Sequence, residues 1–160
     1  MKKVLFMKNN YPHLPYREKV WGLVLNENNQ VLLIQAVDYK INEWSFPGGG
    51  VDEGESEEEA VLRELSEELG VSEDCFRIVK KSVFKHSYFF PDELVEKHGK
   101  QWKGQRAATF LLKMVCDKNF KLQVEELKDF KWVDVKDLEK YLVFPNQWIF
   151  VQELLKEFNL

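Results

Sequence analysis

The stretch that decides the fold runs from Gly49 to Val71 and reads GGVDEGESEEEAVLRELSEELGV. Ser56, followed three residues later by Glu59, is a capping box of the kind that begins helices. Gly70 stands where such a helix would end. Between these signals, apolar residues recur at helical spacing: Val61, Leu62, Leu65 and Leu69. The stretch therefore predicts an amphipathic helix over residues 57–69.

Three glutamates of this helix, Glu64, Glu67 and Glu68, stand at positions i, i+3 and i+4, so they project from one side. Like charges at these spacings cost a helix about 0.2–0.5 kcal/mol per pair. They could simply be surface glutamates, but a hard divalent cation with oxygen ligands would offset the repulsion. We therefore expect Mg²⁺, or alternatively Mn²⁺, as a cofactor at this position.

The same stretch contains the pattern G-x5-E-x7-R-E-U-x-E-E-x-G-U, where U is a bulky aliphatic residue, without a departure. In this it resembles the Nudix box. The resemblance implies an α/β (α+β) fold, the Nudix α/β/α sandwich, with a mixed central sheet and the box as a loop-helix-loop. It also implies a hydrolase acting on phosphoric anhydride bonds. The length of 160 residues suits one such domain, residues 1–160.

The rest of the chain reads as alternating strands and short helices. Residues 21–26 and 31–36 are predicted to form a hairpin, and residues 44–46 a short strand. A long β segment over 76–90 precedes a polar loop with a helical turn, and strands are expected over 107–116 and 130–133. A short helix through Leu142 and a final helix opened by Pro145 complete the order.

Charge is distributed unevenly. Residues 52–74 hold eleven acidic residues and one basic residue, whereas the remainder holds 22 basic and 16 acidic residues. A mildly basic body around an acidic site would suit a polyanionic substrate held near a metal ion. Cys75 and Cys116 lack metal-type spacing, so we expect reduced thiols. Residues 1–7 do not resemble a signal peptide and no apolar run is long enough to span a membrane, which predicts a cytoplasmic protein.

The Nudix resemblance assigns roles within the box. Glu64, Glu67, Glu68 and the Gly49 carbonyl would bind the metal. Arg63 would orient a box glutamate, either Glu67 or Glu59, and so join the catalytic set.

The residue that takes a proton from the attacking water stays open between Glu64 and a glutamate outside the box, Glu125 or Glu126. Glu126 begins a segment, residues 126–132, similar to the E-F-x-x-W-x-W motif of one Nudix subgroup. In that motif the glutamate completes the metal site, so Glu126 joins the predicted catalytic and metal-binding residues. Glu55 is expected to support the junction between loop and helix.

Three further segments narrow the substrate. Residues 44–49, 88–91 and 102–105 resemble those of the subgroup that contains dinucleoside tetraphosphate hydrolases and bacterial RNA 5′-pyrophosphohydrolases. The resemblance implies a dinucleoside polyphosphate or a 5′-triphosphate RNA end as substrate. The alternatives are a (deoxy)nucleoside triphosphate pyrophosphatase, a hydrolase of nucleotide conjugates and a non-catalytic nucleotide sensor. The expected partners are thus a small nucleotide or an RNA 5′ end, without DNA or a membrane, bound by a monomer or homodimer.

One departure from the subgroup concerns phosphate binding. The subgroup has a lysine where this chain has Ala108, and Arg106 or Lys103 could replace it. Tyr88 could stack on a nucleobase. With Gln105 these residues form the predicted substrate-binding set. His86 and His98 are expected to be structural.

Overall fold

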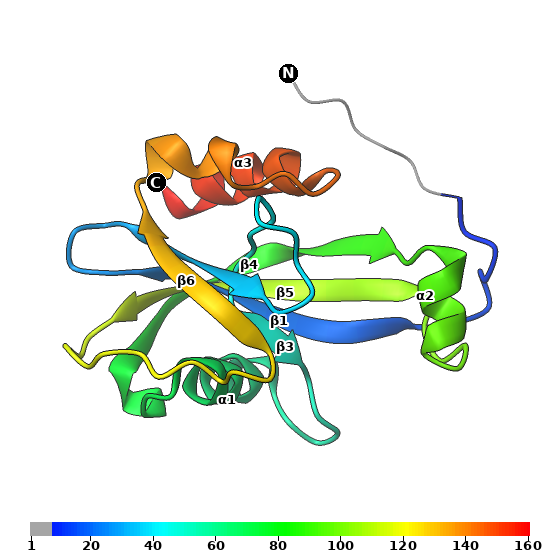
Figure 1. Cartoon of the computed structure of the whole chain (residues 1–160), viewed down its shortest axis with the longest axis horizontal. Helices are drawn as coiled ribbons and strands as arrows, with labels where there is room; N and C mark the ends of the chain where they lie inside the picture. The colour runs from blue at the N-terminus through cyan, green and yellow to red at the C-terminus, as the bar shows by residue number, and fades with distance from the viewer. Residues whose placement is uncertain (1–7) are drawn as a thin grey trace.

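A central β-sheet lies between two helical layers in the computed structural model, which describes residues 8–160 (Figure 1). Helix α1 (Glu57–Leu69) covers one face of the sheet, and helix α3 (Gln147–Phe158) covers the other. The short helix α2 (Asp92–Lys97) lies at one end of the long strands. Residues 1–7, where no signal peptide is expected, lie outside the described residues. None of the helices in the described part has the length and apolar character needed to cross a bilayer.

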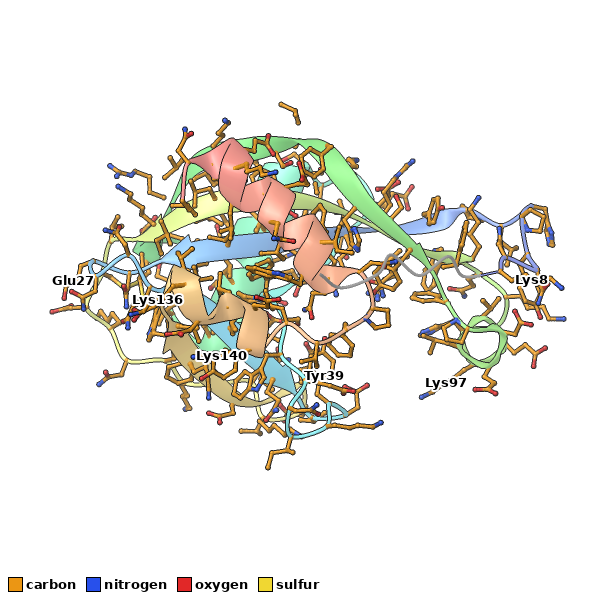
Figure 2. All side chains as sticks on the ribbon, turned by 90° about the horizontal axis from the view of Figure 1, so that it is seen from above. Lys8, Glu27, Tyr39, Lys97, Lys136 and Lys140 are labelled. Atoms are coloured by element: carbon orange, nitrogen blue, oxygen red, sulfur yellow. A yellow bond between two sulfur atoms is a disulfide. The ribbon has the colours of Figure 1, made fainter. Side chains whose placement is uncertain are left out.

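The sheet is mixed, as predicted, and its strand order is β4-β5-β1-β2-β6, with β3 paired to β1. Strand β1 runs parallel to β5, and the remaining pairings are antiparallel. The strands span Tyr16–Leu25 (β1), Val31–Ala36 (β2), Gly48–Gly50 (β3), Phe76–Phe89 (β4), Gly104–Met114 (β5) and Leu127–Val133 (β6). Seen from above, the β1–β2 turn, marked by Glu27, and α2, marked by Lys97, lie at opposite ends of this sheet (Figure 2).

Alternation along β1 divides the apolar interior into two cores. Val20 and Val24 point toward α1 and pack with its buried residues Ala60, Val61, Leu65 and Leu69. Leu23 and Leu25 point to the other face, where they pack with Val151, Leu154 and Phe158 of α3. Because successive strand residues face opposite sides, β1 anchors both helical layers.

Several predicted boundaries were wrong. Strand β1 begins at Tyr16 instead of residue 21, because its first half pairs with β5 from Tyr16↔Gly104 onward. The expected strand over residues 44–46 is reduced to one isolated bridge, Ile34↔Ser45, and the glycines 48–50 form β3 instead. The short segment before Leu142 is a 3₁₀ helix over Val135–Lys140. Helix α3 begins at Gln147, after Asn146 in the left-handed conformation, instead of at Pro145.

The prediction of free thiols was also wrong, because Cys75 and Cys116 form a disulfide with a Cα–Cα distance of 4.9 Å. Cys75 closes the 3₁₀ turn Glu73–Cys75 just before β4, and Cys116 follows β5. The antiparallel pairing of Phe76 with Met114 brings the two together. Their 41-residue separation in sequence carried no sign of this proximity.

Candidate active site

The glutamates of the box lie on a helix whose ends are fixed as the sequence predicts. The Ser56 side chain accepts a hydrogen bond from the Glu59 N–H (3.1 Å), and the Ser56 N–H donates to Glu59 Oε2 (2.8 Å). Gly70 ends α1 with a φ of 65°, a left-handed conformation that glycine adopts without strain. The apolar stripe of α1 is buried against the sheet. Packing of that stripe determines which way the glutamates point.

Glu68 and Glu64 lie against the glycine strand β3. Glu68 is only 5% exposed, and its Oε2 accepts a hydrogen bond from the Gly48 N–H at 3.1 Å. A Cβ added at Gly49 would overlap the carboxyl group of Glu64, so a side chain there would displace this carboxylate from its position. Burial raises the pKa of Glu64, and it raises the pKa of Glu68 to about 8. These two carboxylates are therefore held in a place that disfavours their charge.

Arg63 links the box loop to the box helix. Its Nε and Nη2 donate to the two carboxylate oxygens of Glu55 at 2.6 and 3.0 Å, and Nη2 also donates to the Gly50 carbonyl at 3.0 Å. Its Nη1 donates to Glu64 Oε1 at 2.9 Å and to Glu67 Oε2 at 3.4 Å. The hydrogen bonds from Arg63 hold the pKa of Glu55 below its usual range. Arg63 thus orients the loop and two glutamates together.

The two predicted partners of Arg63, Glu67 and Glu59, lie in different places. The contact with Glu67 is present but longer than those with Glu55 and Glu64. Glu59 instead completes the capping box at the start of α1. Glu55 lies at the loop–helix junction as predicted, where it also accepts from the Asp52 N–H at 2.9 Å.

The segment before β6 brings Glu126 toward the box. The Gln123 N–H donates to the Glu68 carbonyl at 3.0 Å, which ties this segment to the end of α1. The negative charge of Glu126 contributes to the raised pKa of Glu64 and of Glu68. Glu125 is not among the largest contributors to either shift. Of the two glutamates considered outside the box, Glu126 is therefore the one near the box carboxylates.

The donor set fits a hard divalent cation. Within residues 8–160, no three His, Cys, Asp or Glu side chains already converge as a metal site. However, Glu64 and Glu68 carry oxygens beside the Gly49 backbone, and Glu67 shares Arg63 with Glu64. A bound cation would stabilise the charged form of the buried Glu68, which burial alone disfavours. Oxygen donors of this type are those that Mg²⁺ prefers.

The predicted substrate-binding residues separate into two groups. Tyr88 of β4 is opposite Gln105 of β5, which is opposite Arg17 of β1, so these three side chains share one face of the sheet. The Gln105 Oε1 atom is buried and has no hydrogen-bond partner among the described residues. Arg17 lies 5.5 Å from the centroid of the Trp102 ring and also close to Gly50. This row therefore adjoins the glycine strand of the box.

Arg106 and Lys103 lie around Tyr16. Arg106 shares a face with Ala108, as predicted, and forms an ion pair with Glu18 on β1. Its guanidinium lies 5.8 Å from the centroid of the Tyr16 ring, and the Lys103 ammonium lies 4.7 Å from the same centroid. The structure thus brings Arg106 and Lys103 together but not into the row that contains Tyr88 and Gln105.

Sequence reasoning missed two basic residues, Arg17 and Lys19. Both belong to the part of β1 that was not predicted as a strand, and both alternate onto the face of Tyr88 and Gln105. Lys19 is opposite Gly50 of β3, next to the box. The only signal in the sequence is that Arg17 and Lys19 stand four and two residues before Trp21. This spacing places the three side chains on one face once β1 is extended to Tyr16.

His86 belongs to an aromatic cluster on the α3 side. Its ring stacks on Phe150 with centroids 4.2 Å apart, and the Trp21 ring lies 5.7 Å away. Burial lowers the pKa of His86 to about 4, so the ring is neutral near neutral pH. His98 packs between the rings of Phe90 and Trp102. These contacts agree with the structural role expected for both histidines.

Comparison with known proteins gives a consistent picture. Residues 15–154 match the NUDIX domain. The RNA pyrophosphohydrolases of Sphingopyxis alaskensis and Novosphingobium aromaticivorans are 32% and 34% identical to this chain, over 94% and 96% of it and 97% and 98% of their own lengths. Two solved structures share the fold. One is a Caenorhabditis elegans Ap4A hydrolase complex, with a TM-score of 0.64 and 22% identity over 88% of this chain and 95% of that one. The other is the MutT protein of Methanosarcina mazei, with a TM-score of 0.66 and 20% identity over 91% of this chain and 96% of that one. The chain therefore belongs to the Nudix family of hydrolases, which act on phosphoric anhydride bonds.

Proposed function

We propose that this chain is a divalent-metal-dependent RNA 5′-pyrophosphohydrolase that hydrolyses the 5′-triphosphate of an RNA end and releases pyrophosphate. The observation that carries the proposal is the complete set of box carboxylates in a chain whose relatives, matched over nearly their whole length, are RNA pyrophosphohydrolases. A nucleotide sensor would not need every box glutamate. The proposal treats residues 1–160 as one Nudix domain that acts in the cytoplasm, as a monomer or homodimer.

The proposed metal ligands are Glu64, Glu67, Glu68, Glu126 and the Gly49 carbonyl. When bound, Mg²⁺ would neutralise charge on the phosphates and lower the pKa of a coordinated water. The chain's own contribution is to hold the carboxylates ready. The Gly48 N–H fixes one oxygen of Glu68, and Arg63 fixes one oxygen of Glu64.

We infer that either Glu64 or Glu126 accepts the proton of the attacking water. Glu64 adjoins Gly49, and the charge of Glu126 acts on both Glu64 and Glu68. Replacing each one separately by Gln distinguishes them. Either change removes a proposed ligand and should weaken metal binding, but at saturating metal only the variant that lacks the base should lose the rise of kcat between pH 6 and 9.

On the substrate side, the proposal assigns nucleobase stacking to Tyr88. The Tyr88 ring is 36% exposed and lies 6.0 Å from Phe90 and 5.9 Å from His86. An exposed ring supported from both sides is a suitable platform for a base. Gln105 beside it would offer its unpaired amide oxygen to the base or ribose, and Arg106 and Lys103 would lie farther along the RNA.

A substrate panel tests the proposal. The purified chain is incubated with Mg²⁺ and, in separate reactions, a short 5′-triphosphorylated RNA, diadenosine tetraphosphate and dGTP, with products resolved by mass in ¹⁸O water. The proposal predicts the highest kcat/KM for the RNA and none for any substrate after chelation of the metal. Preference for dGTP would instead indicate a house-cleaning nucleoside triphosphate pyrophosphatase. Preference for diadenosine tetraphosphate would indicate a dinucleoside polyphosphate hydrolase. Binding without turnover would indicate a sensor.

A further inference from the structure

Lys19 lies beside the box on the face of β1 opposite to α1. Its two cross-strand neighbours are Gly50 on β3 and Ala107 on β5. These are the two smallest residues, so neither neighbour fills the space around the lysine side chain. Its ammonium lies 5.6 Å from the centroid of the Trp21 ring. Lys19 is thus a partly buried cation beside the glycine strand, where the guanidinium of Arg17 also lies close to Gly50.

The surroundings of Lys19 are anionic but do not neutralise it directly. Among residues 8–160, no carboxylate lies within 4 Å of its ammonium. Burial lowers the pKa of Lys19 and the charge of Arg17 lowers it further, whereas the charges of Glu68, Glu64 and Glu126 act in the opposite direction. A partly buried cation without an ion-pair partner is unfavourable unless an anion binds to it. The three glutamates are themselves the proposed metal ligands, so they are committed elsewhere.

Two other basic side chains near this region, those of Arg106 and Lys85, are already paired, whereas Arg17 has no ion pair among the described residues and lies over the Trp102 ring. Arg106 is held by Glu18, and Lys85 pairs with Glu57 at 2.9 Å. The carboxylates that act most strongly on Arg106 are those of Glu18 and Glu57, and neither is a proposed metal ligand. Arg106, the residue that the sequence suggests as a replacement for the lysine absent at position 108, therefore lies outside the reach of the box carboxylates. Lys19 lies within it.

We propose that Lys19 binds a phosphate oxygen of the substrate, next to the metal-bound phosphate, and so takes the role of the missing lysine. The inference rests on the proposed function of the box and adds a specificity-determining residue to it. A lysine ammonium is a point charge with three donors, which suits a phosphate chain whose conformation varies. Binding of the phosphate would give the Lys19 ammonium the anionic partner that it lacks among residues 8–160.

Lys19→Met and Lys131→Met form a matched pair of variants. Lys131 on β6 is also partly buried, also lies over a tryptophan ring (4.6 Å from the Trp44 centroid) and has no ion pair in the described chain. Its cross-strand neighbour is Leu33 on β2, so it does not adjoin the glycine strand β3. Lys19→Arg keeps the charge and serves as the rescue variant. Circular dichroism and thermal unfolding establish that each variant is folded.

The first readout is calorimetric binding of inorganic pyrophosphate in the presence of Mg²⁺, which does not require turnover or a correct choice of RNA as substrate. We expect Lys19→Met to weaken pyrophosphate binding by about 10- to 100-fold, the range for a lost hydrogen bond to a charged group. Lys131→Met should stay within about twofold of the wild type, and Lys19→Arg should recover part of the loss. Equal affinities for Lys19→Met and the wild type would overturn the inference.

The second readout separates phosphate binding from charge balance at the carboxylates. Mn²⁺ binding without any phosphate is measured by electron paramagnetic resonance. A phosphate-binding role predicts unchanged or slightly tighter Mn²⁺ binding in Lys19→Met, together with a raised KM. If Lys19→Met alters Mn²⁺ affinity and leaves pyrophosphate affinity and KM unchanged, Lys19 only balances the glutamates and the proposal fails. Absence of turnover of triphosphorylated RNA by the wild type would instead refute the proposed function, while the pyrophosphate measurement still decides the role of Lys19.

Discussion

The two faces of strand β1 are built in different ways. Toward α1, Val20 and Val24 pack against a helix whose glutamates are spaced by the helix itself. Toward α3, Lys19 and Trp21 meet Ala107 and Thr109 of β5, which are far away in sequence. The first face derives most of its proposed ligands from one continuous segment, to which the chain before β6 adds Glu126, and the second derives its residues from strand pairing. Hydrolysis is thus encoded locally, whereas substrate choice depends on the assembled sheet.

Loss of one box carboxylate should have the largest effect on activity. The Glu67 side chain is 54% exposed and contributes little to packing. Glu67→Gln should therefore lower kcat by about 10²-fold or more with little change in thermal unfolding. Steady-state kinetics with Mg²⁺ measures this. Near-normal turnover would mean that Glu67 is not a metal ligand. Hydrolysis would then not depend on all three glutamates of α1, as the comparison of the two faces assumes.

The disulfide should contribute to stability on the α1 side of the molecule. It closes a loop over a sequence separation of 41 residues, which on chain-entropy grounds corresponds to about 2–4 kcal/mol of unfolding free energy. Urea unfolding of the wild type with and without reductant measures this contribution. The Cys75→Ser/Cys116→Ser double variant is the control, since reductant should not affect it. An identical midpoint for the reduced and untreated wild type would mean that the thiols are free, as their spacing in the sequence suggests.

Removal of the Tyr88 ring should affect substrate binding more than chemistry. Stacking of one base on an aromatic ring contributes about 1–3 kcal/mol, so Tyr88→Ala should raise KM by about tenfold with a smaller change in kcat. Tyr88→Phe keeps the ring and is the matched control. A fall in kcat at constant KM would place Tyr88 outside the substrate-binding face.

The last expected effect concerns the pH dependence of stability on the α3 side. The folded-state pKa of His86, about 4, lies below the value of about 6.5 for an unfolded histidine. The unfolded chain therefore takes up this proton first as pH falls. Stability should be fully present above pH 6.5 and decrease from there to pH 4. His86→Phe should lessen this decrease, as followed by urea midpoints, and an unchanged slope would argue that His86 is hydrated.

Local chemistry explains which features could be predicted from the sequence. The capping box, the apolar stripe and Gly70 lie within one helix, so α1 was predicted with its correct bounds, Glu57–Leu69. Strand β3 was missed because three glycines have no β-type side chains, and its pairing with β1 is what makes it a strand. The first half of β1 was missed because Arg17, Glu18 and Lys19 interrupt the apolar pattern.

The candidate site likewise combines residues that local sequence predicts with residues that it does not. Glu64, Glu67 and Glu68 follow from helical spacing, and the nearness of Glu126 to them follows from a similar motif. The position of Lys19 beside Gly50, and that of Arg17 beside Gln105, depends on the register between β1 and its neighbours. Register is a property of the folded sheet, so no spacing within the sequence could indicate these contacts.

The most direct test of the account is metal binding by the box carboxylates, because every other assignment depends on it. Mn²⁺ titrations followed by electron paramagnetic resonance compare the wild type, Glu64→Gln/Glu67→Gln/Glu68→Gln, and a charge-matched control, Glu53→Gln/Glu58→Gln/Glu73→Gln, whose three residues are exposed. The account predicts tight Mn²⁺ binding and hydrolysis by the wild type and the control, and loss of both in the box variant. Mn²⁺ binding by the box variant equal to that of the wild type would contradict it.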